Sequence, residues 1–215
     1  MKLVIFDLDG TLVDSQEFIL EAQKRAFSAH QIAPPSREAA LSIVGLSLHE
    51  AFTILAGAHG PIESLAKAYR DAWGAMRADP AFEEPLYPGA REAIAALAAN
   101  DDVMLGIATG KARRGVVHLL ERTGWRDWFA TVQTADDHPS KPAPNMILSA
   151  LTETGAAPNS TYMIGDTSYD MEMGRAAGVH PIGVAWGYHS GTELREAGAE
   201  RIVADFAELL HLIEM

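Results

Sequence analysis

The sequence predicts an α/β protein, with a doubly wound parallel sheet as its core and a helical domain inserted into it. Two observations support this prediction. Short apolar runs alternate with helical patterns at the start of the chain and again over residues 85–215. From residue 15 to residue 84 the alternation stops, and one helical pattern follows another. We therefore expect residues 1–14 and 85–215 to form the core and residues 15–84 to form the insertion.

Six short apolar runs have the length and composition of buried parallel strands. They cover Leu3–Phe6, Val103–Ala108, Ala130–Thr134, Tyr162–Gly165, Pro181–Ala185 and Arg201–Ala204. Helical patterns follow over Ala90–Ala99, Arg113–Arg122, Ala143–Thr154 and Asp205–Ile213, the last with Asp205 as its N-cap. In sheets built this way, ligands bind outside the carboxyl ends of the strands, so polar residues at those ends are candidates for a site.

The insertion contains four further helical patterns. They cover Glu17–Ala29, Arg37–Ile43, Leu48–Ala56 and Ile62–Met76. Breakers such as Pro34-Pro35, Gly45 and Gly60-Pro61 separate them, and Pro85 to Gly89 marks the return to the core. We expect a small helical domain that begins directly after the first strand.

The composition is typical of a globular protein and argues against several classes. Hydrophobic residues make up 48% of the 215, and the formal net charge of −12 leaves no basic stripe for nucleic acid. Without cysteine, disulfides and thiolate metal sites are excluded. The first apolar run ends at Asp7, too soon for a secretory or membrane-spanning segment. We expect a cytoplasmic monomer or small homo-oligomer that binds neither nucleic acid nor membrane.

Two carboxylates lie at the end of the first strand. Asp7 and Asp9, at positions i and i+2, are expected to start on the same side of the chain, just before the turn at Gly10. One ionised acid can attack or bind a metal while its neighbour transfers protons. With an ordinary pKa of about 3.9, Asp7 would be ionised at neutral pH without help. The amide of Gly10 can approach an anion, although an Asp-Gly turn is also common at strand ends.

Four segments together resemble the signatures of the haloacid dehalogenase (HAD) superfamily of phosphohydrolases, in the same order. They are Phe6–Ser15, Ile107–Lys111, Ser140–Pro144, and Met163–Thr167 with Asp170 and Met171 behind it. The resemblance covers nearly the whole chain and is greatest to phosphoglycolate phosphatase-like members, whose helical cap occupies the position of residues 15–84. It implies a Rossmann-like core and a cap that closes over the catalytic face and excludes water.

The resemblance implies a Mg²⁺-dependent phosphatase reaction at the two aspartates. Asp7 would be the nucleophile that becomes an aspartyl phosphate, and Asp9 would be the general acid and then the general base. Mg²⁺ would be held by the Asp7 carboxylate, the Asp9 backbone carbonyl and Asp166. Asp170 would orient Lys141 or a metal-bound water.

The same resemblance implies a set of substrate ligands. Thr109, the amide of Gly110 and Lys141 would bind the phosphate, together with Gly10. On the cap, Gly45 lies in a loop expected to face the site, and Arg70 could meet a substrate carboxylate in bidentate fashion.

Each of these residues also has a purely structural interpretation. Lys141 could be an exposed lysine before a helix-starting proline, and Thr109-Gly110 an ordinary strand end. Asp166 and Asp170 could cap a helix, and Arg70 could be a solvated helix residue. The loop Trp186–His189 resembles one in phosphoglycolate phosphatase-like members, and a packing role fits it equally well.

Several residues narrow the reaction within the superfamily. Dehalogenating members lack an acid at the position of Asp9, and sugar phosphomutases typically have Val at the position of Thr11 and His at that of Ile19. The cap lysines Lys24 and Lys67 show no Schiff-base signature. These differences favour a phosphomonoester phosphatase acting on a small phosphorylated metabolite, with phosphoglycolate ahead of sugar phosphates, nucleotides and pyrophosphate. The alternatives are a phosphomutase like β-phosphoglucomutase and a non-catalytic binding protein with the HAD fold.

Overall fold

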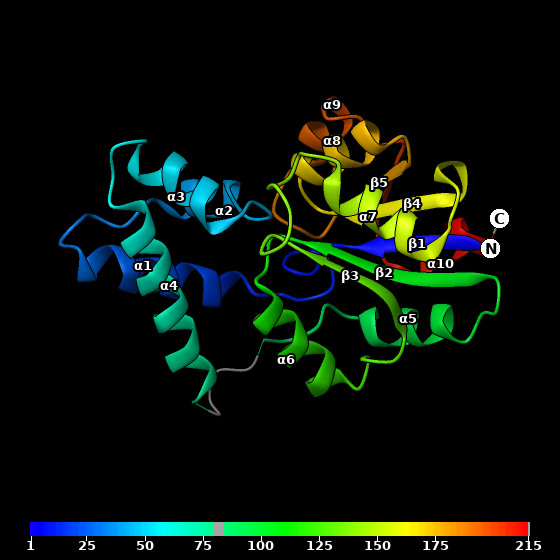
Figure 1. Ribbon diagram of the computed structural model, residues 1–215, viewed down its shortest axis with the longest axis horizontal. Coiled ribbons are helices and arrows are strands. Elements are labelled where there is room, and N and C mark those ends of the chain that lie inside the picture. Colours follow the sequence, from blue (N-terminus) through cyan, green and yellow to red (C-terminus); the bar gives the residue numbers. More distant parts are fainter. Residues whose placement is uncertain (80–83, 215) are drawn as a thin grey trace.

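A six-stranded parallel sheet forms the centre of the core in the computed structural model, which describes residues 1–79 and 84–214 (Figure 1). Within these residues the strands lie in the order β3-β2-β1-β4-β5-β6. Their bounds are Lys2–Phe6 (β1), Val103–Thr109 (β2), Phe129–Thr134 (β3), Thr161–Gly165 (β4), His180–Val184 (β5) and Arg201–Val203 (β6). The α/β fold class is confirmed, and each predicted strand is present with its ends within one residue of those expected. The order reverses between β1 and β4, where ligands of such sheets bind.

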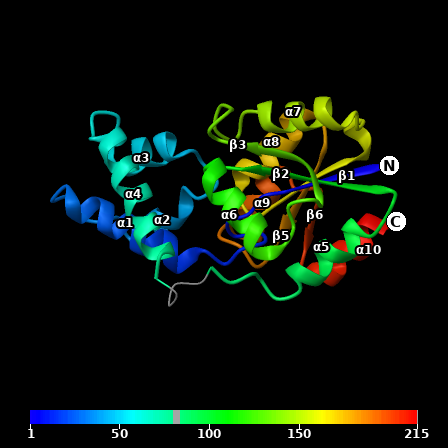
Figure 2. The same cartoon turned by 60° about the horizontal axis from the view of Figure 1, so that its bottom comes forward.

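Helices cover both faces of the sheet (Figure 2). Helices α5 (Ala90–Ala98), α6 (Arg113–Thr123) and α10 (Phe206–Glu214) pack on one face, and α7 (Asn145–Thr154) and α8 (Ser168–Ala177) on the other. The Asp205 carboxylate accepts a hydrogen bond from the amide of Glu208, which confirms the predicted N-cap of α10. Within the described part of the chain, no helix combines the length and apolar character needed to cross a bilayer.

Two helices of the core were not among the predicted ones. Helix α8 contains Gly174, which suggests a break in the sequence, yet here it lets the helix approach Pro181 and Met163 of the sheet. Helix α9 (Gly191–Glu196) is only six residues long and begins with a capping box between Ser190 and Glu193.

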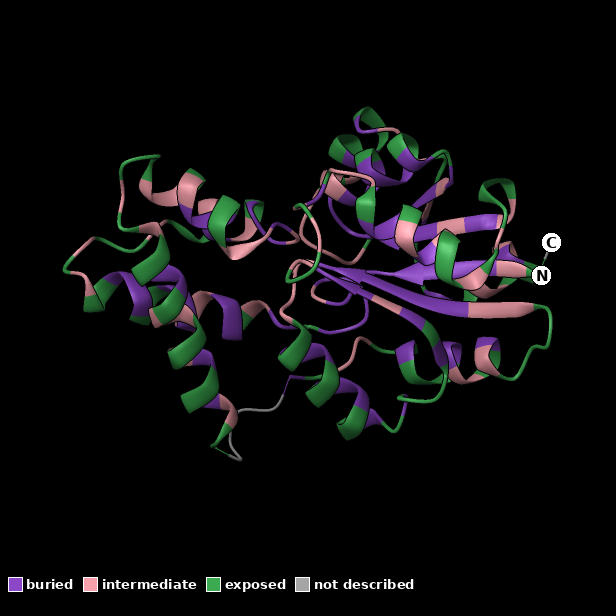
Figure 3. Ribbon diagram, viewed as in Figure 1, coloured by how far each residue is buried: buried purple, intermediate pink, exposed green. Residues whose placement is uncertain are grey.

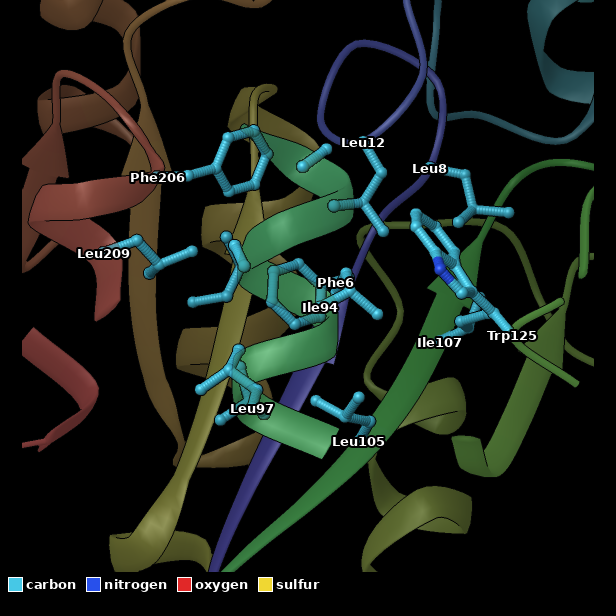
Figure 4. Packing of buried hydrophobic residues seen from close by; sticks show 14 of the residues in the cluster. Phe6, Leu8, Leu12, Ile94, Leu97, Leu105, Ile107, Trp125, Phe206 and Leu209 are labelled. Carbon is cyan, nitrogen blue, oxygen red and sulfur yellow. The ribbon is translucent and has the colours of Figure 1, made fainter. Parts of the chain in front are cut away.

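The core around β1 is formed by large apolar side chains (Figure 4). Phe6 is fully buried and lies beside Ile94 and Leu97 of α5, with Phe206 and Leu209 of α10 beyond them. On the opposite face, Leu3 and Ile5 pack in a second cluster. Because β1 is buried on both faces, the residues that follow it are held in a fixed position.

The insertion forms a separate helical layer beside the carboxyl ends of the strands (Figure 1). Its helices are α1 (Gln16–Ala29), α2 (Arg37–Ser42), α3 (Leu48–Ala56) and α4 (Ile62–Arg77). Buried residues lie where α1 and α4 meet, among them Ile19 and Trp73 (Figure 3). The two connections to the core run side by side, since Val13 pairs with Leu86 and the amide of Asp14 donates to the carbonyl of Pro85. We call this layer, residues 16–79, the cap.

Candidate active site

A buried cluster of three acids and one lysine lies at the carboxyl ends of β1 and β4. Asp7 follows β1, Asp166 follows β4, Asp170 lies in the first turn of α8, and Lys141 lies before α7. The Lys141 ammonium is 2.6 Å from an oxygen of Asp170 and 3.0 Å from Oδ2 of Asp7. Burial alone would lower the pKa of Lys141, but the Asp170 and Asp7 carboxylates outweigh it and raise the pKa to about 12. Lys141 is therefore a permanent buried cation, not an exposed lysine.

The two oxygens of Asp7 have different surroundings. Oδ1 accepts a hydrogen bond from the amide of Leu8 at 2.7 Å, whereas Oδ2 is buried and faces the Lys141 ammonium. Burial raises the pKa of Asp7 to about 6, against the opposing charge of Lys141. This value lies above the ordinary carboxyl pKa on which the expectation of an ionised Asp7 was based, because the group has lost its surrounding water. At pH 7 the carboxylate is still mostly ionised.

Asp166 is held by two neighbouring segments, the turn after β1 and the loop after β5. One oxygen accepts a hydrogen bond from the Thr11 hydroxyl, and the other accepts one from the amide of Tyr188 in the loop after β5. A valine at position 11 could not make the first bond. Gly10 packs so closely that a Cβ there would lie 2.2 Å from Asp166. The absence of a side chain at Gly10 therefore leaves room for Asp166. The amide of Gly10 donates to the carbonyl of Val13, so the expectation that this amide faces an anion was wrong.

The donor set of this cluster fits a hard divalent cation. Asp7, Asp166 and Asp170 each offer a carboxylate oxygen within 4.8 Å of the others. Burial raises the pKa of Asp166 well above its usual range, and the charges of Asp170 and Asp7 add to this effect. When all three carboxylates are ionised, as metal binding requires, the single ammonium leaves two negative charges that a divalent cation would balance. Both oxygens of Asp170 already accept hydrogen bonds, from Lys141 and from Thr167, so Asp170 orients Lys141.

Asp9 lies apart from Asp7 and pairs with a different lysine. Both oxygens of Asp9 accept hydrogen bonds from the Lys111 ammonium, at 2.8 and 3.2 Å. Lys111 also pairs with Glu84 in the second connection to the cap, and its ammonium lies 4.6 Å from the ring centre of Trp73. Sequence reasoning missed Lys111 and Glu84 as parts of the site. The signal was present, because Lys111 directly follows Thr109 and Gly110 in the second signature.

Thr109 and Gly110 lie where the core meets the cap. The Thr109 hydroxyl is buried and accepts a hydrogen bond from the amide of Lys111. Gly110 faces the backbone of the cap loop, so that a Cβ built on it would lie 2.4 Å from the carbonyl oxygen of Gly45 and 2.6 Å from that of Leu46. Close packing of these two loops thus requires glycine at position 110.

Replacing Gly110 with alanine is expected to push the cap away from the core, because the methyl group would meet two backbone carbonyls that cannot rotate aside. We expect kcat/KM for any substrate to fall roughly 100-fold, the loss typical of a 1 Å misplacement in a site. Gly191→Ala is the matched control, since its Cβ would meet nothing closer than 3.5 Å. Equal kinetics for the two variants would contradict the close contact described here.

A cavity of about 440 Å³ lies between the cap and the core. Asp9, Gly45, Arg70 and Gly110 are among the residues that line it, whereas Asp7, Thr109, Lys141 and Asp166 are not. We call this cavity the chamber. The structure therefore brings Asp7, Lys141, Asp166 and Asp170 together in one cluster and places the two cap residues, Gly45 and Arg70, around a neighbouring space that Asp9 also faces.

Comparison with known proteins agrees with this geometry. A family model described as haloacid dehalogenase-like hydrolase matches residues 4–184. The chain belongs to the HAD-like hydrolases. The signature segments of this HAD-like hydrolase all fall within the match, and the chain is therefore an enzyme of the hydrolase class.

Relatives of this HAD-like hydrolase are similar over nearly their whole length. Probable phosphatase IndB of Dickeya dadantii is 35% identical over 97% of this chain and 91% of its own. A phosphoglycolate phosphatase of Chromobacterium violaceum is 34% identical and covers 100% of this chain and 97% of its own. The crystal structure of a hydrolase from Pseudomonas syringae matches with a TM-score of 0.87 at 28% identity, covering 100% of this chain and 99% of that one.

Proposed function

We propose that this enzyme is a cytoplasmic Mg²⁺-dependent phosphatase that hydrolyses a small phosphorylated metabolite through an aspartyl phosphate on Asp7. The observation that carries this proposal is the state of Asp7 Oδ2. This oxygen is buried and lies 3.0 Å from the Lys141 ammonium, whereas the other oxygen of Asp7 is taken up by the amide of Leu8. A buried carboxylate oxygen beside a fixed cation is suited to attack a phosphoryl group whose charge that cation offsets.

The proposed reaction has two steps. Asp7 Oδ2 forms a bond to phosphorus while the bond to the leaving oxygen breaks, and Asp9 gives that oxygen its proton. Water then attacks the aspartyl phosphate, Asp9 takes a proton from this water, and Asp7 is regenerated as phosphate departs. Lys141 offsets the negative charge on the phosphoryl oxygens in both steps, and the Thr109 hydroxyl and the Gly110 amide are proposed to bind these oxygens.

The metal would be held by Asp7, Asp166 and the backbone carbonyl of Asp9. When bound, Mg²⁺ supplies positive charge that reduces the repulsion between an anionic nucleophile and an anionic phosphate. Its binding is expected to depend on pH, because the carboxylates must be deprotonated. With the pKa of Asp7 raised to about 6, protons compete with the cation below that pH. Because a cation that binds only the folded state stabilises it, we expect millimolar Mg²⁺ to raise Tm at pH 7.5 and to have little effect on Tm at pH 5.

The direct test is phosphate release from a panel of esters, with Mg²⁺ and with a chelator. Phosphoglycolate, the substrate favoured by the sequence, heads the panel, followed by sugar phosphates, nucleotides and pyrophosphate. Metal-dependent release is the expected result. Isomerisation of a sugar phosphate without release would instead indicate a phosphomutase, and folded protein that binds Mg²⁺ but converts nothing would indicate a binding protein.

A further inference from the structure

The chamber is larger than a two-carbon leaving group requires. Its volume of about 440 Å³ falls in the range of pockets that hold drug-sized organic ligands, roughly 300–1,000 Å³. Of the residues assigned to phosphate chemistry, only Asp9 and Gly110 line it, while Asp7, Thr109 and Lys141 do not. Since Asp9 is the proposed donor to the leaving oxygen, the chamber is the space into which the leaving group would extend.

Most of the chamber wall is apolar and comes from the cap. Three aromatic rings lie in series, with ring centres 5.8 Å apart for Phe52 and Tyr69 and 5.5 Å apart for Tyr69 and Trp73. Aliphatic side chains, including Ile43 and Val44, complete this side. A small, fully hydrated acid gains nothing from such a wall, because its polar groups lose water without new partners. An apolar body the size of a ring gains by burial and by ring contacts.

Two arginines that line the chamber have no counter-charge within the described residues. Arg70 extends from the cap helix α4 and Arg114 from the core helix α6, and both are exposed and line the chamber. Neither makes a hydrogen bond or ion pair within residues 1–79 and 84–214, whereas Arg77 and Lys111 pair with Glu84. In a chain with a net charge of −12, two unpaired guanidinium groups among the lining residues favour an anionic group on the ligand.

From these three observations we propose that the chamber selects phosphate monoesters whose leaving group has an apolar, ring-sized body with an anionic group at its far end. This inference rests on the proposed phosphatase function and makes phosphoglycolate a poor substrate. The aromatic wall binds the body, Asp9 faces the bridging oxygen, and Arg70 and Arg114 bind the terminal anion.

The test compares three alkyl esters that separate the two features. Benzyl phosphate has the body alone, 4-carboxybenzyl phosphate has the body and the anion, and phosphoglycolate has the anion without the body. We expect kcat/KM with Mg²⁺ to be about tenfold to a hundredfold higher for 4-carboxybenzyl phosphate than for phosphoglycolate, with benzyl phosphate between them. Equal or better hydrolysis of phosphoglycolate would overturn the inference and leave the phosphatase function intact.

Binding separates a failure of recognition from a failure of chemistry. The affinities of the three esters for the Asp7→Asn variant, measured by titration calorimetry, are expected to follow the same order. If the affinities followed this order but the wild type released no phosphate, the proposed ligand preference of the chamber would be supported and the proposed phosphatase function would be contradicted. Arg70→Gln is expected to reduce the preference for 4-carboxybenzyl over benzyl phosphate about tenfold. Lys67→Gln, one turn earlier on α4 and 71% exposed, is the control and should keep the preference. An unchanged preference in Arg70→Gln would overturn the role of Arg70.

Discussion

Asp7→Asn is expected to abolish phosphate release while the protein stays folded. The amide cannot attack phosphorus as a carboxylate does, and loss of the nucleophile in a covalent mechanism lowers kcat by at least about 10⁴-fold. The measurement is phosphate release at saturating ester and Mg²⁺. Asp127→Asn makes the same change at an exposed position in the loop between α6 and β3 and should leave kcat unchanged. Release by Asp7→Asn at the wild-type rate would remove Asp7 from the mechanism.

The same substitution is expected to stabilise the metal-free protein. The pKa of Asp7 is raised from 3.8 to about 6 in the folded state, so its favourable contribution is complete below pH 3.8 and is lost as the pH rises through 6. Asparagine is uncharged at every pH, so the variant does not lose this stability when the pH rises. We expect the variant to be more stable than the wild type at pH 7 by about 1–3 kcal/mol and equal to it near pH 4, as urea unfolding would show. A less stable variant at pH 7 would mean that the ion pair with Lys141 outweighs burial.

Lys141→Met is expected to have the largest effect on stability. The ammonium lies 2.6 Å from Asp170 and 3.0 Å from Asp7 and is the cation of the buried cluster. Its removal leaves buried carboxylates without a partner, which costs about 3–5 kcal/mol in the free energy of unfolding at pH 7. The loss should shrink at pH 5, where Asp7 is mostly protonated. Activity should fall roughly 10²–10³-fold, because the charge on the phosphoryl oxygens loses a fixed donor.

Lys67→Met is the matched control for this prediction. Lys67 is 71% exposed and pairs with Asp71 on the surface of α4. Pairs of this kind contribute less than about 1 kcal/mol, so urea unfolding of the control should match that of the wild type. If Lys141→Met unfolded at the same urea concentration as Lys67→Met, the buried cluster would not depend on its lysine.

Local pattern was sufficient to predict the strands of the sheet and the edge of the sheet at which Asp7 and Asp166 meet. Runs such as Leu3–Phe6 are apolar because the strand is buried on both faces, and parallel strands bring Asp7 and Asp166 to one edge whatever their separation in sequence. Helix α8 escaped prediction because Gly174, a breaker in isolation, is used for close packing on the sheet. The helix propensity of a residue contains no information about such tertiary contacts.

The separation of the two aspartates could not be predicted from alternation. Asp7 and Asp9 would share a side if the strand continued, but β1 ends at Phe6 and Asp9 belongs to a turn closed by its bridge to Val13. The pairing of Asp9 with Lys111 and of Lys111 with Glu84 joins segments far apart in the sequence. Tertiary packing determines these ion pairs. It also determines the burial that raises the pKa of Asp7.

The position of the chamber rings has an evolutionary consequence. Phe52, Tyr69 and Trp73 all belong to residues 16–79, whereas every acid of the buried cluster belongs to the core. The aromatic wall of the chamber and the buried acids are thus encoded in separate stretches of the chain. Under the proposed function, a lineage could therefore alter the rings one at a time and change the preferred ester while the acids that carry the reaction stay in place.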